Sequence, residues 1–420
     1  MAILHYTHNP YLTHTLGVAV SGGVDSMVLL HSLVEAGANV VVLSVEHGIR
    51  GEDSVADFEF VQAYAEQKGL SFEGVCVDAP ARAKATGEGL ESAARALRYA
   101  FFESVLSSGR VDYVLTAHHR DDLCETVVMN LLRGSGIVGM IGIADRDRYL
   151  RPLLSYSHAD LVAYAEEHNV PYRTDLSNED QQYRRNWVRH TLLPTVESGY
   201  PAYREALARL SEVAKEQVAL LDSLAIAPTV DADGNVRLPI DALRQPTALA
   251  KYSLHLALSH MGADYTAAHY EALMGLLDAP AGARLDLPHA EAWVEYGDLL
   301  FCPKTESLSL DVPFSPGVYA GYEIRPWQEG DRLRFDLDKI PIGSRIRLRK
   351  KGDRFAKFGG GTKSLGDYYT DAKYPLRLRD CTPIVAIGQD VLLTPIEISR
   401  SIAVDEHSTK IYTYCREKNL

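Results

Sequence analysis

The spacing of apolar residues divides the first two hundred positions into alternating strands and helices. Short runs rich in β-branched residues predict buried strands at Gly17–Val20, Val40–Val45, Phe72–Val77 and Tyr113–Thr116. Between them, apolar residues recur at helical spacing in Met27–Glu35, Ser54–Lys68, Gly89–Leu106 and Leu123–Arg133. Strands that alternate with helices form parallel sheets with crossover helices. The pattern therefore predicts a doubly wound α/β domain over residues 1–200, with ligands beyond the carboxyl ends of its strands.

A second, helical domain is predicted over residues 201–312. Tyr203–Leu224 is amphipathic throughout and is expected to form one linking helix. Thr247–Met261 and Thr266–Leu277 are expected to pair as a helical hairpin, which the strand-like segment Leu285–Leu300 follows.

A small α/β domain is predicted at the C-terminal end, over residues 326–420. Prolines and glycines gather between Asp311 and Gly330, which indicates a linker before this domain. Basic and apolar residues then alternate in Arg345–Arg349, as in a half-exposed strand, and Thr382–Pro395 contains two short apolar runs.

Composition favours a cytoplasmic globular protein. Hydrophobic residues make up 46% of the 420 positions and charged residues 24%, values that are ordinary for soluble domains. No apolar run approaches the roughly 20 residues of a membrane helix, and the first residues lack the pattern of an export signal, so no membrane partner is expected. The five cysteines form no Cys-x-x-Cys pair, which argues against a zinc knuckle and fits a reducing compartment.

The charge is unevenly distributed. A net charge of -13 argues against a nucleic-acid partner, since phosphate binding needs positive surface. However, Arg325–Asp380 contains 15 Lys and Arg against 8 Asp and Glu, seven more positive than negative charges. A basic terminal part on an acidic chain is typical of an RNA-docking module, although a solvated basic face is equally consistent with the count.

The strongest chemical motif directly follows the first predicted strand and precedes the first predicted helix. It consists of Ser21, Gly22, Gly23, Val24, Asp25 and Ser26. Glycines at such a junction let backbone N–H groups approach an anion, and the helix N-terminus adds partial positive charge. An ordinary helix-capping turn is the alternative. The motif lacks the Gly-Lys-Ser/Thr ending of a Walker loop, so transfer of the γ-phosphate is not implied.

A second polar cluster, Ala117–Thr126, opens a helix at the end of the fourth predicted strand. Asp122 and Glu125 lie in it beside His118. With Asp25, the carboxylate of Asp122 would hold the Mg²⁺ that neutralises a pyrophosphate leaving group, and His118 would contact phosphate or move a proton. A charged helix cap is the alternative for these acids. Their expected position at the same sheet edge as the glycine-lined turn favours catalysis by Asp25, His118, Asp122 and Glu125.

The glycine-lined turn resembles the pyrophosphate loop of the PP-loop (N-type ATP pyrophosphatase) class. Further segments, in the same order, are similar to motifs of the tRNA(Ile)-lysidine synthetase family: Ser44–Arg50, Ala94–Tyr99, Leu131–Gly136, Arg151–Leu154, Asp175–Asn178 and Tyr183–Arg189. They cover residues 15–195 densely. Beyond them the resemblance lies in the layout and in the basic segment Arg349–Arg354. One departure is that Ser44 and Glu46 stand where the family usually has His and then Asn or Asp.

The resemblance implies a nucleotide site and a tRNA site. ATP would be bound by the glycine-lined turn with His47 and Arg98, and tRNA by Arg185, Arg189, Lys350, Lys351 and Arg354. Taken alone, arginines at helical spacing more commonly pair with neighbouring acids. Tyr99, Tyr183 and Trp187 are candidates to stack on an unpaired base, with plain packing as the alternative.

The resemblance also implies a reaction. The wobble cytidine of a tRNA(Ile) with a CAU anticodon is adenylated by ATP with Mg²⁺, and free L-lysine then displaces AMP. Other interpretations are a PP-loop ligase acting on a small metabolite, a tRNA thiolase, which would need cysteine pairs, and an RNA-binding module without catalysis. A homodimer is compatible with the sequence, which does not decide the oligomeric state.

Overall fold

The chain divides into two compact units, Met1–Asp222 and Ser223–Leu420. The computed structural model describes residues 13–49, 51–173, 184–262, 265–304, 309–357 and 360–416. Within these residues, no helix has both the length and the apolar character that crossing a membrane requires. The predicted domain boundaries after residues 200 and 312 remain predictions. The division at Asp222 gives two compact units, whereas the sequence predicted three domains.

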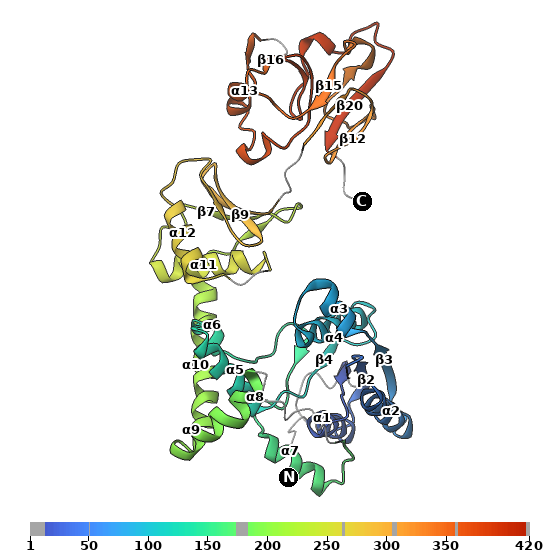
Figure 1. The fold of residues 1–420 in the computed structure, drawn as a ribbon, viewed down its shortest axis with the longest axis vertical. Helices are drawn as coiled ribbons and strands as arrows, with labels where there is room; N and C mark the ends of the chain where they lie inside the picture. The colour runs from blue at the N-terminus through green and yellow to red at the C-terminus, as the bar shows by residue number, and fades with distance from the viewer. Residues whose placement is uncertain are drawn as a thin grey trace. The chain divides into compact units, whose positions relative to one another are not determined.

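The first unit is built on a five-stranded parallel sheet (Figure 1, blue to green). The strand order is β3-β2-β1-β4-β5, with bounds Ser71–Cys76, Asn39–Glu46, Thr15–Ala19, Tyr113–Leu115 and Tyr149–Leu150. Because β1 has β2 on one side and β4 on the other, the chain reverses its direction of progress at β1. The loops after β1 and β4 diverge at this switch point and leave a crevice between them. The predicted doubly wound α/β fold is confirmed.

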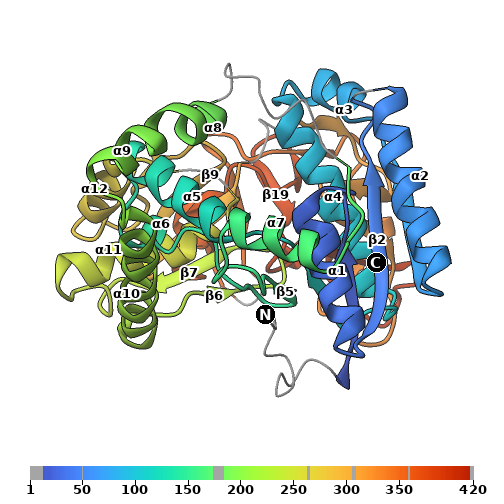
Figure 2. The same cartoon turned by 90° about the horizontal axis from the view of Figure 1, so that it is seen from below.

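Helices cover both faces of this sheet. Figure 2 shows α1, α2 and α4 packed around its strands; their bounds are Val24–Glu35, Glu52–Gln67 and Leu90–Ser107. One core joins β1 and β2 to α1, α2 and α7 (His158–Glu167), with Leu16 and Met27 fully buried. A second core on the other face joins the sheet to Phe102 and Leu106 of α4. Burial of both faces explains why the central strands β1 and β2 are mostly apolar.

Helix α3 (Ala79–Thr86) packs against α4, and the other helices of the first unit lie around α5 (Arg120–Leu132). These are α6 (Ile137–Met140), α8 (Arg184–Trp187), the π-helical turn Val188–Leu192, α9 (Leu193–Gly199) and α10 (Tyr203–Leu224). Two small cores join α5 to this group, one with Met140 and Ala214, the other with Val188, Leu193 and Tyr203. The predicted helix Tyr203–Leu224 is confirmed along its full length.

The second unit begins with an antiparallel sheet of five strands in the order β6-β7-β10-β9-β8. Their bounds are Thr229–Val230, Val236–Pro239, Asp298–Pro303, Ala290–Glu295 and Arg284–Asp286. The predicted helical hairpin is present as α11 (Thr247–Ser259) and α12 (Ala267–Leu276), and it shares one core with this sheet. The sequence predicted a mainly helical domain here, and the structure shows this five-stranded sheet in addition to the two helices.

The C-terminal part of the second unit contains two further sheets. The six-stranded sheet has the order β11-β15-β18-β19-β16-β17, with bounds Asp311–Pro313, Arg345–Arg347, Ile384–Ile387, Asp390–Leu393, Arg354–Ala356 and Thr362–Ser364. The four-stranded sheet has the order β12-β13-β20-β14, with bounds Gly317–Tyr319, Tyr322–Pro326, Ile411–Arg416 and Phe335–Asp336. Helix α13 (Leu365–Asp371) packs on the six-stranded sheet through Tyr368 and Tyr369. The strands expected at Arg345–Arg349 and in Thr382–Pro395 are confirmed.

The predicted linker between Asp311 and Gly330 is wrong, because this segment forms β11, β12 and β13. Pro313 and Pro326 are the last residues of their strands, and β11 is an edge strand. Proline is tolerated at such positions because no ladder hydrogen bond from its nitrogen is needed there.

A buried ion pair shapes the basic segment Arg349–Arg354. Asp353 accepts hydrogen bonds from Arg347 at 2.8 and 2.7 Å and from the backbone N–H of Lys350 at 2.7 Å. The side chains of Arg347 and Asp353 are 4% and 1% exposed. Gly352, with φ +94°, supplies the left-handed residue of this turn. The turn therefore keeps Lys350 and Lys351 at the surface.

Asp353→Asn should lower the free energy of unfolding by about 3–5 kcal/mol, since it leaves the Arg347 guanidinium buried without a counter-charge. Denaturant unfolding monitored by circular dichroism measures the change. Lys351→Ala, on the exposed side of the same turn, is the control and should stay within about 0.5 kcal/mol of the parent protein. A loss for Asp353→Asn as small as the control's would show that the pair contributes little.

Candidate active site

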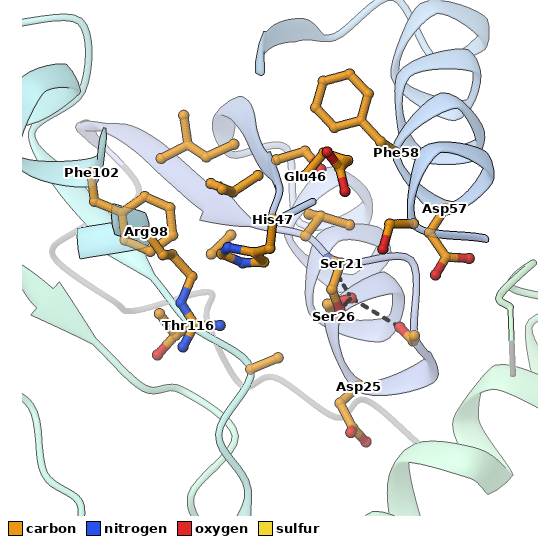
Figure 3. A pocket seen from close by; sticks show the side chains of 18 of the residues that line it. Ser21, Asp25, Ser26, Glu46, His47, Asp57, Phe58, Arg98, Phe102 and Thr116 are labelled. Atoms are coloured by element: carbon orange, nitrogen blue, oxygen red, sulfur yellow. Dashed lines mark hydrogen bonds between the residues drawn. The ribbon is translucent and has the colours of Figure 1, made fainter. Parts of the chain in front are cut away.

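The predicted anion-binding turn connects β1 to α1 at the carboxyl end of the sheet (Figure 3). The backbone N–H of Ser21 donates to the Ser26 hydroxyl at 3.2 Å, and that hydroxyl donates to the Gly23 carbonyl at 2.9 Å. Gly22 has a φ of +90°, a conformation that favours glycine. The hydroxyl of Ser26 thus links the two ends of the turn by hydrogen bonds, and Gly23 is the N-cap residue of helix α1. A glycine-lined turn at a helix N-terminus is suited to phosphate.

A cavity of about 330 Å³ opens beside this turn. Besides Ser21, Gly23, Asp25 and Ser26 it is lined by His47 after β2, Arg98 of α4, and Thr116 and His118 after β4. Figure 3 labels Ser21, Ser26, His47, Arg98 and Thr116 around one space, whereas Asp25 points away from Ser21 and Ser26. The structure therefore brings the predicted nucleotide-binding residues His47 and Arg98 to the same cavity as the turn.

Two histidines of the cavity are kept neutral by their surroundings. Burial lowers the pKa of His118 to about 4, and Nδ1 of its ring is 2.8 Å from the Thr116 hydroxyl. Burial, followed by the charge of Arg98, also lowers the pKa of His47. Neutral imidazoles near pH 7 can accept or donate a hydrogen bond without adding charge to the cavity.

The acidic residues after β4 meet Asp25 across the switch point, as the sequence predicted. His119, which is buried, lies between them: its Nε2 is 3.7 Å from Asp25 Oδ2 and 3.4 Å from Asp122 Oδ2. The backbone N–H of His119 also donates to Asp122 Oδ2 at 3.1 Å. Asp25 and Asp122 are thus close enough to act on one group between the two loops, in a larger cleft that also contains Glu125.

Two arginines neutralise the buried carboxylates. Asp122 Oδ1 accepts from Arg185 at 2.8 Å and from Arg189 at 3.1 Å. Glu125, whose side chain is 1% exposed, accepts from Nε of Arg185 at 2.8 Å and from Nε of Arg189 at 2.5 Å. Burial works against ionisation of Asp122, yet the charges of His119 and Arg185 hold its pKa below the usual range. The predicted tRNA-binding arginines therefore lie among the predicted catalytic acids.

Sequence reasoning missed His158 and Arg204, and it assigned no separate role to Asp121. His158, at the start of α7, has Nδ1 2.9 Å from Asp25 Oδ1, and this hydrogen bond raises the pKa of His158. Asp121 accepts from Arg204 at 2.6 Å and from the backbone N–H of His158 at 2.8 Å. Asp121 stood within the quoted motif without a role. His158 is 133 positions from Asp25 and carries no local signal beyond a helix start, so spacing could not have found it.

Other predicted positions have local roles or lie elsewhere. Glu46, one of the two departures from the family's usual residues, accepts the backbone N–H of Gly48 at 2.7 Å and so stabilises the turn after β2. Tyr99 packs against Tyr149 with ring centroids 5.3 Å apart, which fits the packing alternative. Trp187 is 45% exposed and stays a stacking candidate. Arg50, Asp175–Asn178 and Tyr183 lie outside the described residues.

The predicted basic residues of the second unit are at its surface. Lys350 pairs with Asp311 at 2.8 Å and Arg354 with Asp390 at 3.2 Å. Exposed ion pairs of this kind contribute at most about 1 kcal/mol, so an RNA phosphate can replace the carboxylate. Lys351 is exposed and forms no ion pair within the part of the chain that the structure describes.

A pyrophosphate-type turn opposite an acidic helix start, both at the switch point of a parallel sheet, defines the class of PP-loop nucleotide-binding domains. In agreement, the family model of the PP-loop domain matches residues 3–196.

Relatives of known name cover nearly the whole chain. The tRNA(Ile)-lysidine synthase of Bacillus licheniformis is 32% identical over 89% of this chain and 87% of its own length. The enzyme of the same name from Bacillus subtilis is 30% identical over 93% and 91%. Among solved structures, the TILS C-terminal domain is 26% identical over 26% of this chain and 94% of that chain, with a TM-score of 0.21. The chain belongs to the tRNA(Ile)-lysidine synthase family, and the resemblance found in its motifs is confirmed.

Proposed function

We propose that this chain uses ATP to attach lysine to C2 of the wobble cytidine in an isoleucine tRNA, forming lysidine and changing the codon read from AUG to AUA. The observation that carries the proposal is the meeting of Asp25 and Asp122 on either side of His119, next to the glycine-lined turn. Membership of the tRNA(Ile)-lysidine synthase family supports tRNA as the substrate of this site. It also sets aside the small-metabolite ligase, the tRNA thiolase and the non-catalytic module.

The first step is nucleotidyl transfer in the cavity beside the turn. O2 of the cytidine attacks the α-phosphorus of ATP, and the bond between the α-phosphorus and the bridging oxygen breaks, so that pyrophosphate leaves. We assign the leaving pyrophosphate to Ser21–Ser26, where the turn and the start of α1 supply N–H groups and partial positive charge. Arg98 and neutral His47 and His118 line the same cavity and would contact the nucleotide.

Mg²⁺ fits the donors that face the leaving group. Asp25 and Asp122 offer carboxylate oxygens, the ligands that this hard cation prefers, and both face the same buried ring. These two residues would hold the ion, which supplies charge neutralisation for the departing pyrophosphate.

The second step joins lysine to the base. The ε-amine attacks C2, AMP leaves with the oxygen it had acquired, and the amine loses a proton. We assign the orientation of the amine to Asp122 or Glu125, which lie together in the cleft and here hold Arg185 and Arg189. Both arginines keep a third of the side chain exposed, so they remain candidates for contact with tRNA phosphate.

The remaining tRNA contacts are assigned to the surface turn with Lys350, Lys351 and Arg354. All three side chains are exposed, and the buried Arg347–Asp353 pair fixes the turn that carries them. We place the reaction in the cytoplasm, where the five cysteines, all free thiols, would stay reduced.

Incubation of the full chain with Mg²⁺, ATP, bulk tRNA and each of the radiolabelled amino acids in turn tests the substrates. Lysine alone should enter the RNA, with AMP and pyrophosphate formed in step. Omission of ATP is the control. Labelling by another amino acid, or AMP release without labelled RNA, would contradict the proposal.

Asp25→Ala and Asp122→Asn should each lower tRNA-dependent ATP–pyrophosphate exchange by at least about 100-fold, since each removes a group that stabilises the leaving charge. Binding of tRNA, measured by filter retention, should change little. Asp53→Asn, an exposed carboxylate at the start of α2, is the matched control. Normal exchange in both site variants would remove these carboxylates from the reaction.

Replacing Lys350, Lys351 and Arg354 together by Ala should have the opposite effect. The affinity for tRNA should fall, and the slope of log affinity against log salt should decrease by up to about 3, one per lost phosphate contact. The charge-matched control replaces Lys68, Lys84 and Arg110, which are exposed on the first unit. Equal affinity in the two triple variants would refute the docking role of this turn.

A further inference from the structure

The site contains nitrogen ligands that a magnesium site does not need. One donor atom each of Asp25, His119 and His158 lies within 4.8 Å of the other two. The closest pair is His158 Nδ1 and Asp25 Oδ1 at 2.9 Å, and His119 Nε2 is 3.7 Å from Asp25 Oδ2. Donors of a tetrahedral zinc site are about 3.3 Å apart, so only small side-chain movements separate this arrangement from one.

His119 has the surroundings of a metal ligand. Its ring is buried, and Nδ1 has no hydrogen-bond partner among the described residues. Nε2 lies 3.4 Å or more from the two nearest carboxylate oxygens, beyond ordinary hydrogen-bond length. A buried ring nitrogen without a partner is costly, and a cation on Nε2 would leave Nδ1 as the N–H that faces Asp121 Oδ2, 3.6 Å away.

Asp121 supplies the support that histidine ligands usually have. Its Oδ2 is 3.6 Å from His119 Nδ1 and accepts the backbone N–H of His158 at 2.8 Å. Arg204 fixes the other oxygen at 2.6 Å. A carboxylate behind a ligating imidazole sets its tautomer and orientation, so that the opposite nitrogen faces the ion. Asp121 thus holds the backbone of His158 and lies directly behind the His119 ring.

A metal ion can reach the donor atoms of Asp25, His119 and His158 from solvent. Asp25, His119 and His158 all line the larger cleft of the first unit, and the side chain of His158 is 51% exposed. Two imidazoles and one carboxylate are typical of zinc-type ions, whereas Mg²⁺ prefers oxygen donors alone.

We propose that Asp25, His119 and His158 form a binding site for one Zn²⁺ ion, with a fourth position open to water or to Asp122. The site needs no ATP, so its occupancy can be measured separately from the lysidine reaction. Because Asp25 would serve both ions, Zn²⁺ at this site withholds a carboxylate from Mg²⁺ and the nucleotide.

The test uses the full chain, stripped of metal with a chelator and free of ATP. Calorimetric titration with Zn²⁺ should show one ion per chain, and Co²⁺ as a probe should give the intense visible absorption of a four- or five-coordinate site. His158→Gln should weaken Zn²⁺ binding about 100-fold or more and abolish the Co²⁺ absorption. Asp121→Asn, which keeps every ligand, should weaken binding about tenfold.

His168→Gln, at the other end of α7, is the matched control and should bind as the parent does. Since His158 is half exposed, its variant should keep the parent's thermal unfolding, which shows that lost binding is not lost folding. Unchanged Zn²⁺ affinity in His158→Gln, or no stoichiometric Zn²⁺ binding by the parent, would overturn the site. Neither result bears on lysine incorporation, which tests the proposed function separately.

Discussion

The neutralisation of buried negative charge at the tip of β4 organises the first unit. Asp121, Asp122 and Glu125 lie in the first two turns of α5, and Asp25 approaches them from the first turn of α1. Uncompensated carboxylates cannot be buried together, because each loses hydration and repels the others. Arg185, Arg189 and Arg204 supply the positive charge, and all three come from the helical segment that follows the sheet domain. The packing of α8–α10 against α5 thus has an electrostatic reason as well as an apolar one.

The same compensation prepares the site for the proposed chemistry. The arginines hold carboxylates that an ion or an ammonium group would otherwise occupy, so binding involves exchange of one cation for another. Exchange costs less than creating a buried charge, since the negative groups keep a partner throughout. The neutral histidines His47 and His118, by contrast, leave the nucleotide cavity without added charge.

In the second unit, a buried ion pair fixes the conformation of a surface turn. Asp353 is held by Arg347 and by a backbone N–H, and this carboxylate fixes the turn whose outer face carries Lys350 and Lys351. Two residues of one basic segment therefore have different functions. The buried pair is structural, whereas the exposed lysines are available to a partner, a distinction that the charge count alone could not make.

The sequence by itself determined the alternation of strands and helices in the first unit and the place of the Ser21–Ser26 turn. These features depend on local periodicity and on glycine at a strand–helix junction, which neighbouring residues decide. It failed for the segment with Pro313 and Pro326, whose prolines end strands, and it did not show β6 and β7, which are too short for a period. Only the tertiary structure decided which arginine meets which acid and that His158 reaches Asp25. These pairs are brought together by sheet order and helix packing across 60 to 133 positions, and no local sequence pattern predicts a contact of that range.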